Sequence, residues 1–169
     1  GCELIPVVQG GMGVGVSAGG LAGTVARAGG IGTISSVDLR RLHPDLMEKT
    51  AHLTKVAGSK PAIDAANLEA LDREIRAARA LANGNGMIAV NVMRALSEYE
   101  AYVKQALASG ADAIVVGAGL PLVLPELAQD HPEVALIPIL SDARGVPLVV
   151  RTWMKKGRLP DAIVIEHPR

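Results

Sequence analysis

The chain has 169 residues, and its 17 Lys and Arg residues balance its 17 Asp and Glu residues, so the formal net charge is zero. This length is typical of one domain, and the balanced charge argues against a nucleic-acid-binding protein, which gathers basic charge on one face. The single cysteine, Cys2, excludes an internal disulfide and predicts a cytoplasmic protein. The chain has neither an uninterrupted apolar run of about 18 residues nor a secretory-signal pattern. We therefore expect no membrane association.

Short apolar runs alternate with helical patterns along the chain. The core must be aliphatic, because there is no phenylalanine and aromatic residues make up 2%. Runs rich in Val, Ile and Leu are typical of parallel strands buried on both faces. The predicted strands are residues 4–9, 31–35, 87–92, 113–116, 135–140 and 162–166.

Helices are predicted between these strands. Ser17 is the expected N-cap of a helix over 17–28, Asn67 of a helix that runs to Ala82, and Ser97 of a helix over 97–109. Further helices are predicted over 44–56, 122–129 and 146–156, and a loop over 58–66. The long connection over 37–66 is either a lid over the ligand site or a plain insertion.

The alternation of strands and helices predicts an α/β fold with a parallel sheet and right-handed crossovers. Two closures remain open at this point, a doubly wound sheet and part of a (β/α)8 TIM barrel. No linker or change in composition divides the chain, so residues 1–169 are expected to form one domain.

In both architectures ligands bind at the carboxyl ends of the strands. The residues there are small or polar, and Asn91 interrupts an otherwise apolar strand. Its amide needs hydrogen-bond partners, either within the sheet or on a ligand.

The segment 13–18 also matches the loose dinucleotide pattern G-x-G-x-x-A, with Asp38 at the distance of a ribose contact. That pattern is weak evidence for an NAD-binding protein, because the chain has 19 glycines.

The sequence resembles the nitronate monooxygenase (2-nitropropane dioxygenase) family, whose members are FMN-dependent (β/α)8 barrels. The resemblance runs in order through segments 5–13, 26–36, 88–92, 115–121, 137–141 and 161–166, beginning with IPVVQGGMG. It implies a TIM barrel of which about six βα units are present.

The resemblance also implies a set of FMN-binding residues. The first glycine-rich turn places backbone against the flavin, the third strand contributes an asparagine and the sixth ends in an acidic residue. A serine stands where several relatives have a lysine at the end of the fifth strand. The predicted cofactor-binding residues are Gly10, Gly11, Met12, Asn91, Ser141 and Glu166, and no metal site is expected.

The catalytic histidine of the family follows the sixth strand in a Gly-Gly-His segment that lies beyond residue 169. No catalytic residue is therefore assigned, and His167 is expected to have a loop role. The implied reaction of the whole enzyme is oxidation of alkyl nitronates or nitroalkanes by O2. The alternatives are a flavin-dependent NAD(P)H reductase of enoyl-ACP or quinones on the same barrel, and a noncatalytic fragment.

Six strands of an eight-stranded barrel leave two open edges with unpaired backbone groups. We therefore expect the 169-residue chain alone to be marginally stable or to associate, with a homo-oligomer as one outcome. Without the phosphate-binding loops that the resemblance places after the sixth strand, it should bind FMN weakly and be inactive.

Overall fold

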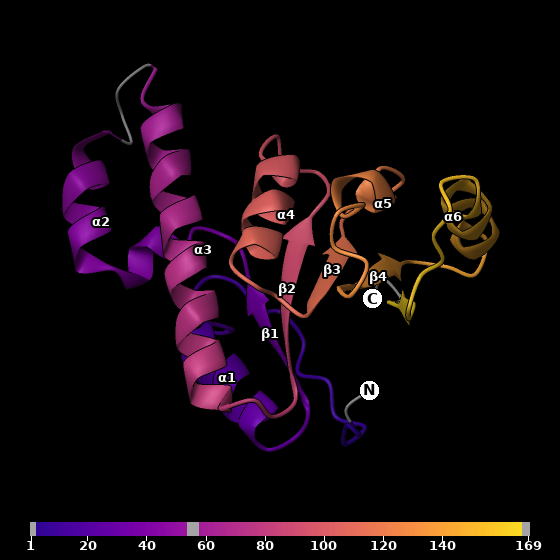
Figure 1. Cartoon of the computed structure of the whole chain (residues 1–169). Coiled ribbons are helices and arrows are strands. Elements are labelled where there is room, and N and C mark those ends of the chain that lie inside the picture. Colours follow the sequence, from indigo (N-terminus) through magenta and orange to yellow (C-terminus); the bar gives the residue numbers. More distant parts are fainter. Residues whose placement is uncertain (1–2, 54–57, 167–169) are drawn as a thin grey trace.

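The computed structural model describes residues 3–53 and 58–166, which form a five-stranded parallel sheet covered by helices (Figure 1). The strand order β1-β2-β3-β4-β5 follows the chain without a reversal. A doubly wound sheet reverses its order at a switch point, so this order excludes that alternative. The predicted incomplete parallel (β/α)8-type barrel is confirmed. The strands are β1 (Ile31–Ser35), β2 (Met87–Met93), β3 (Ala113–Gly117), β4 (Ala135–Leu140) and β5 (Val164–Ile165).

The helices lie in an arc around the outer side of the strands in Figure 1, from α3 through α4 and α5 to α6. Among the described residues, none of the helices combines the length and apolarity that a membrane crossing needs. The α-helices are α1 (Gly19–Arg27), α2 (Pro44–Thr50), α3 (Lys60–Ala82), α4 (Tyr99–Ala108), α5 (Leu124–Leu127) and α6 (Gly145–Met154), and the 3-10 helices are η1 (Leu39–Leu42) and η2 (Ala51–Leu53).

Alternate residues of β1 to β4 pack into two separate apolar clusters, while the two residues of β5 are exposed. The larger cluster joins the helices to strand residues such as Ile88, Val90 and Ile114. The smaller cluster contains Ala89, Ala113, Val115 and Ile137 and lies on the opposite, inner face of the sheet. Burial on both faces explains why the strands are continuous aliphatic runs.

The predicted first strand forms only in part. Residues 4–9 run parallel to β1 with a single bridge between Val8 and Ile31. The Gln9 backbone N–H donates to the Ile31 carbonyl oxygen at 2.9 Å, and the Ile31 backbone N–H donates to the Val7 carbonyl oxygen at 2.9 Å. Val7 and Val8 remain 54% and 63% exposed, so this segment lacks the two-sided burial of β1 to β4.

Three predicted helix caps are wrong, and at two of them a contact from elsewhere in the fold takes the place of the cap. Helix α3 begins well before Asn67, whose buried Oδ1 instead accepts the Arg40 backbone N–H at 3.2 Å. At the start of α1, the Gly19 N–H donates to Glu74 Oε2 of α3 at 2.6 Å, and Ser17 makes no cap. Ser97 does not cap α4 either.

The part of the 37–66 connection that precedes α3 packs against that helix, whereas residues 60–66, predicted as loop, are the beginning of α3 itself. Arg73 holds the carboxylate of Asp45 with two hydrogen bonds of 2.9 and 2.8 Å, and this pairing lowers the pKa of Asp45 to about 2. His43 Nε2 lies 3.0 Å from Glu74 Oε1. The helix predicted over 44–56 is α2 followed by η2, and its last residues lie outside the described part of the chain. The lid role of 37–66 stays a prediction.

Both tyrosines of the chain lie on α4 and are buried, which favours their neutral phenols. Burial raises the pKa of Tyr102 from 10.0 to about 12 and raises the pKa of Tyr99 as well.

The contribution of the two neutral phenols to the free energy of unfolding is therefore complete below pH 10 and is lost as the pH rises toward 12 and beyond. We expect no tyrosinate absorbance near pH 10 in the folded chain, and ionisation near pH 10 in denaturant. Ionisation near pH 10 with intact far-ultraviolet circular dichroism would contradict this assignment.

Candidate functional site

A layer of four side-chain positions crosses the inner face of the sheet, near the carboxyl ends of β1 and β2 and at the middle of β3 and β4. Ser35 of β1 is in register with Asn91 of β2, Asn91 with Val115 of β3, and Val115 with Ile137 of β4. The layer is polar at the β1–β2 side and aliphatic at the β3–β4 side. In a barrel this edge of the sheet is where ligands bind.

The glycine-rich loop after residue 9 packs onto the polar half of this layer. A Cβ atom at Gly11 would lie 2.7 Å from Asn91 Cβ and 2.9 Å from Asn91 Nδ2, and one at Gly13 would lie 3.2 Å from Ser35 Oγ. Only a residue without a side chain permits this approach of the backbone. The structure thus brings Gly11 directly against Asn91, with Gly10 and Met12 on either side in the same loop.

Asn91 is half-buried and is held through its backbone, since its carbonyl oxygen accepts the Ser36 N–H at 3.1 Å. Within the described residues its side-chain amide makes no hydrogen bond. The neighbouring Ser36 hydroxyl is fully buried and has no partner there either. An amide with both a donor and an acceptor free at a strand end can bind a ligand.

Ser141 and Glu166 form a second group of predicted residues at the same edge. Each follows its strand directly, β4 for Ser141 and β5 for Glu166, and both are exposed. The Glu166 N–H donates to the Leu140 carbonyl oxygen at 2.9 Å, which ties the two strand ends together. Gly117 and the loop after β3 lie between this group and Asn91 in the sheet order. His167 and Cys2 lie outside the described residues.

Sequence reasoning missed two residues that fix the glycine loop, Gln9 and Ser17. Ser17 Oγ accepts the Met12 N–H at 2.8 Å and donates to the Gly10 carbonyl oxygen at 3.0 Å. Gln9 Nε2 donates to Ser17 Oγ at 2.9 Å, and Gln9 Oε1 accepts the Thr33 N–H at 3.0 Å. The available signal was a glutamine that ends an apolar run directly before a glycine pair.

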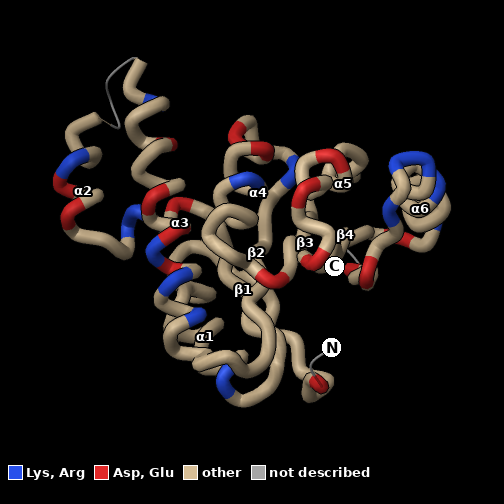
Figure 2. The backbone as a smooth tube through the Cα atoms, viewed as in Figure 1, with Lys and Arg blue, Asp and Glu red and all other residues tan. Residues whose placement is uncertain are grey.

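The site is electrically neutral over its first part. Residues 4–26 contain no lysine, arginine, aspartate or glutamate, and the corresponding tube in Figure 2 is uniformly tan. In the described ranges, no group of three or more His, Cys, Asp and Glu residues could hold a metal ion. Exposed backbone groups, a free amide and aliphatic side chains suit a flat polar ring better than a compact, highly charged ligand.

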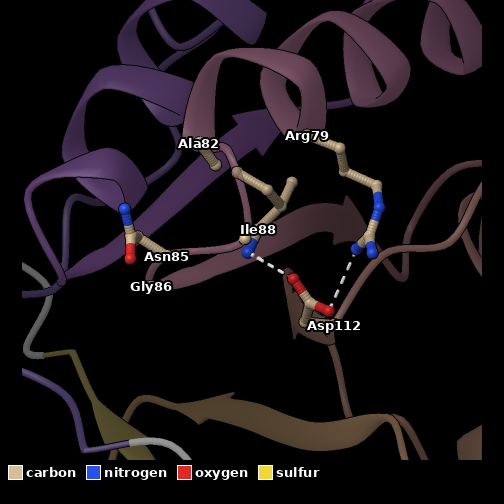
Figure 3. Close-up of a pocket in the computed structure, with 7 residues that line it drawn as sticks. Arg79, Ala82, Asn85, Gly86, Ile88 and Asp112 are labelled. Atoms are coloured by element: carbon tan, nitrogen blue, oxygen red, sulfur yellow. Dashed lines mark hydrogen bonds and ion pairs between the residues drawn. The ribbon is translucent and has the colours of Figure 1, made fainter.

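A small cavity of about 90 Å³ lies at the opposite, amino-terminal end of the strands (Figure 3). Asp112 accepts the Ile88 N–H at 2.8 Å and pairs with Arg79 at 3.1 Å. Asp161 accepts the Leu136 N–H at 2.8 Å in the same manner. The cavity is well below the roughly 300–1,000 Å³ of ordinary ligand pockets, and its charged residues brace the strands.

The contact between the loop and Asn91 predicts that alanine substitution at two adjacent glycines, Gly10 and Gly11, changes the free energy of unfolding by different amounts. Gly11→Ala should lower the free energy of unfolding by about 1–3 kcal/mol, because its Cβ overlaps Asn91. Gly10→Ala is the matched control and should be nearly neutral, because no atom of the described residues lies within 4 Å of its Cβ position. Chemical denaturation of the two variants measures the difference, and equal stabilities would disprove the contact.

The sequence matches a known protein family, and the fold is similar to that of solved structures. The family model described as nitronate monooxygenase matches residues 3–169. The structure of FabK from Thermotoga maritima is similar over 95% of this chain and 40% of its own, with a TM-score of 0.64 and 19% sequence identity. A single-residue mutant of that protein gives a TM-score of 0.52 at 20% identity over 92% and 41% of the two chains.

A nitroalkane oxidase from Streptomyces ansochromogenes matches 95% of this chain and 64% of its own at 14% identity, but its TM-score of 0.38 is too low to support an argument. No curated protein sequence gives a significant match. The chain spans about two fifths of the length of the two FabK structures, and at these identities they support the barrel fold alone. The family match extends over almost every residue, so the chain belongs to the nitronate monooxygenase family.

Proposed function

We propose that the whole protein to which these residues belong is a cytoplasmic FMN-dependent oxidoreductase that oxidises alkyl nitronates with O2. The observation that carries this proposal is the uncharged glycine loop packed onto Asn91 at the strand ends of a chain that belongs to this family. Two nitronate anions and one O2 would give two carbonyl compounds and two nitrite ions, which balances atoms and charge.

The described residues fit the flavin ring at this edge. Among the described residues no atom lies within 4 Å of a Cβ position at Gly10, and Asn91 offers an unpaired amide against the neighbouring Gly11. Val115 and Ile137 supply an apolar surface in the same layer. When bound, FMN supplies an electron acceptor for the substrate and a donor for O2.

The proposed roles of the residues follow from these positions. The backbone at Gly10, Gly11 and Met12 would hold the ring edge, and Asn91 would hydrogen-bond a polar atom of the ring. Glu166 and Ser141 would bind the cofactor or a nearby water from the β4–β5 side. Because the chain spans only part of the relatives that it matches, the complete reaction is proposed for the whole protein.

The reaction is tested by adding FMN to the whole protein and supplying either a nitronate with O2 or NADH with a quinone or enoyl thioester. We expect nitronate-dependent oxygen uptake with nitrite release, and no NADH-dependent reduction of the flavin. Oxidation of NADH without nitronate turnover would replace this function by the reductase alternative. The absence of bound flavin would overturn both and leave the noncatalytic alternative.

Replacement of Asn91 tests its role at the flavin. Asn91→Ala should weaken FMN binding about three- to tenfold, which corresponds to the loss of one hydrogen bond. Asn85→Ala is the matched control, because Asn85 is exposed at the opposite end of the strands, where it lines the small cavity. Quenching of flavin fluorescence on titration measures both affinities, and equal affinities would remove Asn91 from the site.

A further inference from the structure

We infer that Ser17 and Gln9 form a polar clamp that sets the backbone of residues 10–12 in the orientation that receives the flavin. They are positioning residues, because they act through the loop and not on the substrate. This inference rests on the proposed function and adds to it the residues that prepare the loop before the cofactor arrives.

The hydroxyl of Ser17 uses its full hydrogen-bonding capacity on this loop. A serine hydroxyl has one donor and two acceptor positions. Its donor goes to the Gly10 carbonyl oxygen at 3.0 Å, and its acceptor positions take the Met12 N–H at 2.8 Å and Gln9 Nε2 at 2.9 Å. The side chain is 1% exposed, so water does not replace these partners when they are lost.

The backbone of Ser17 fixes the same hydroxyl to the sheet. The Ser17 N–H donates to the Met12 carbonyl oxygen at 2.9 Å, and the Ser17 carbonyl oxygen accepts the Ser35 N–H at 2.9 Å. Ser35 belongs to the same layer of side chains as Asn91. The loop is therefore tied to the strand end on which the ligand would rest.

Gln9 connects the loop to the sheet from the other side. Its Oε1 accepts the Thr33 N–H of β1 at 3.0 Å, while its Nε2 donates to Ser17 Oγ and to the Gly10 carbonyl oxygen. One side-chain amide thus joins β1, the loop and Ser17, which lies two residues before α1. No charged group takes part in these contacts, so the clamp adds no charge to the neutral site.

The clamp leaves a defined set of backbone groups for a ligand. Ser17 already forms hydrogen bonds with three backbone groups of the loop, which are the Gly10 carbonyl oxygen, the Met12 N–H and the Met12 carbonyl oxygen. In the described part of the chain, the N–H and C=O of Gly11 have no hydrogen-bond partner. Glycine-rich backbone has many conformations of similar energy, and the clamp selects the one in which Gly11 lies on Asn91.

The first measurement is amide hydrogen exchange in the flavin-free protein. Ser17→Ala should speed exchange of the Met12 N–H on the order of tenfold, the effect of losing one hydrogen bond. Core amides such as that of Val90 should keep their rates, which separates a local release from a general loss of stability. Ser17→Thr retains the hydroxyl and should restore slow exchange. Unchanged exchange at Met12 in Ser17→Ala would overturn the clamp.

The second measurement is FMN affinity and the circular dichroism that bound flavin acquires from its surroundings. Ser17→Ala should weaken binding on the order of tenfold and change the flavin band, with recovery in Ser17→Thr. Ser97→Ala is the control, because Ser97 is an exposed serine that donates only to the neighbouring Glu98. If wild type binds FMN and Ser17→Ala binds it equally well, this inference fails. If wild type binds no FMN, the proposed function itself fails.

Discussion

In the described part of the chain, each strand after β1 pairs in parallel with the strand that precedes it, and this constraint determines where chemistry can occur. Parallel neighbours end at the same edge, so residues far apart in the sequence meet in one layer of side chains. The helices must then return along the outer face, and side chains fill the inner face, which leaves the carboxyl ends of the strands for a ligand. The glycine loop completes this edge by packing onto Asn91.

The two ends of the sheet differ in chemistry. At the carboxyl ends the groups near β1 and β2 are amides, hydroxyls and exposed backbone, without charge from residue 4 to residue 26. At the amino ends, Asp112 and Asp161 accept strand N–H groups and pair with Arg79 and Arg158. The charged contacts at the amino ends stabilise the sheet, while the glycine loop at the carboxyl ends carries no charge.

Much of the fold could be predicted from the sequence, because burial on both faces gives strands a local signature. The β4 range, Ala135–Leu140, was predicted correctly to the residue, and the alternation of elements indicated the parallel topology. Asn67 was predicted wrongly, because its partner is the backbone of Arg40, far from it in the sequence. The interpretation of Ser17 as a helix cap failed for the same reason, since cap preference is local and the contacts of its hydroxyl depend on the loop's path.

Asp112 and Asp161, which accept these strand N–H groups, each begin the same short sequence, Asp-Ala-Ile-Val, at residues 112–115 and 161–164. Each aspartate lies just before one strand, β3 or β5, and accepts a hydrogen bond from the backbone of the preceding strand. The donors are the N–H groups of Ile88 and Leu136, the second residues of β2 and β4. Each fastening closes over only 24 or 25 residues of chain. Closures of this length cost less loop entropy than pairings between segments farther apart in the chain. A chain built this way can assemble progressively as it leaves the ribosome, each new strand docking on one already in place.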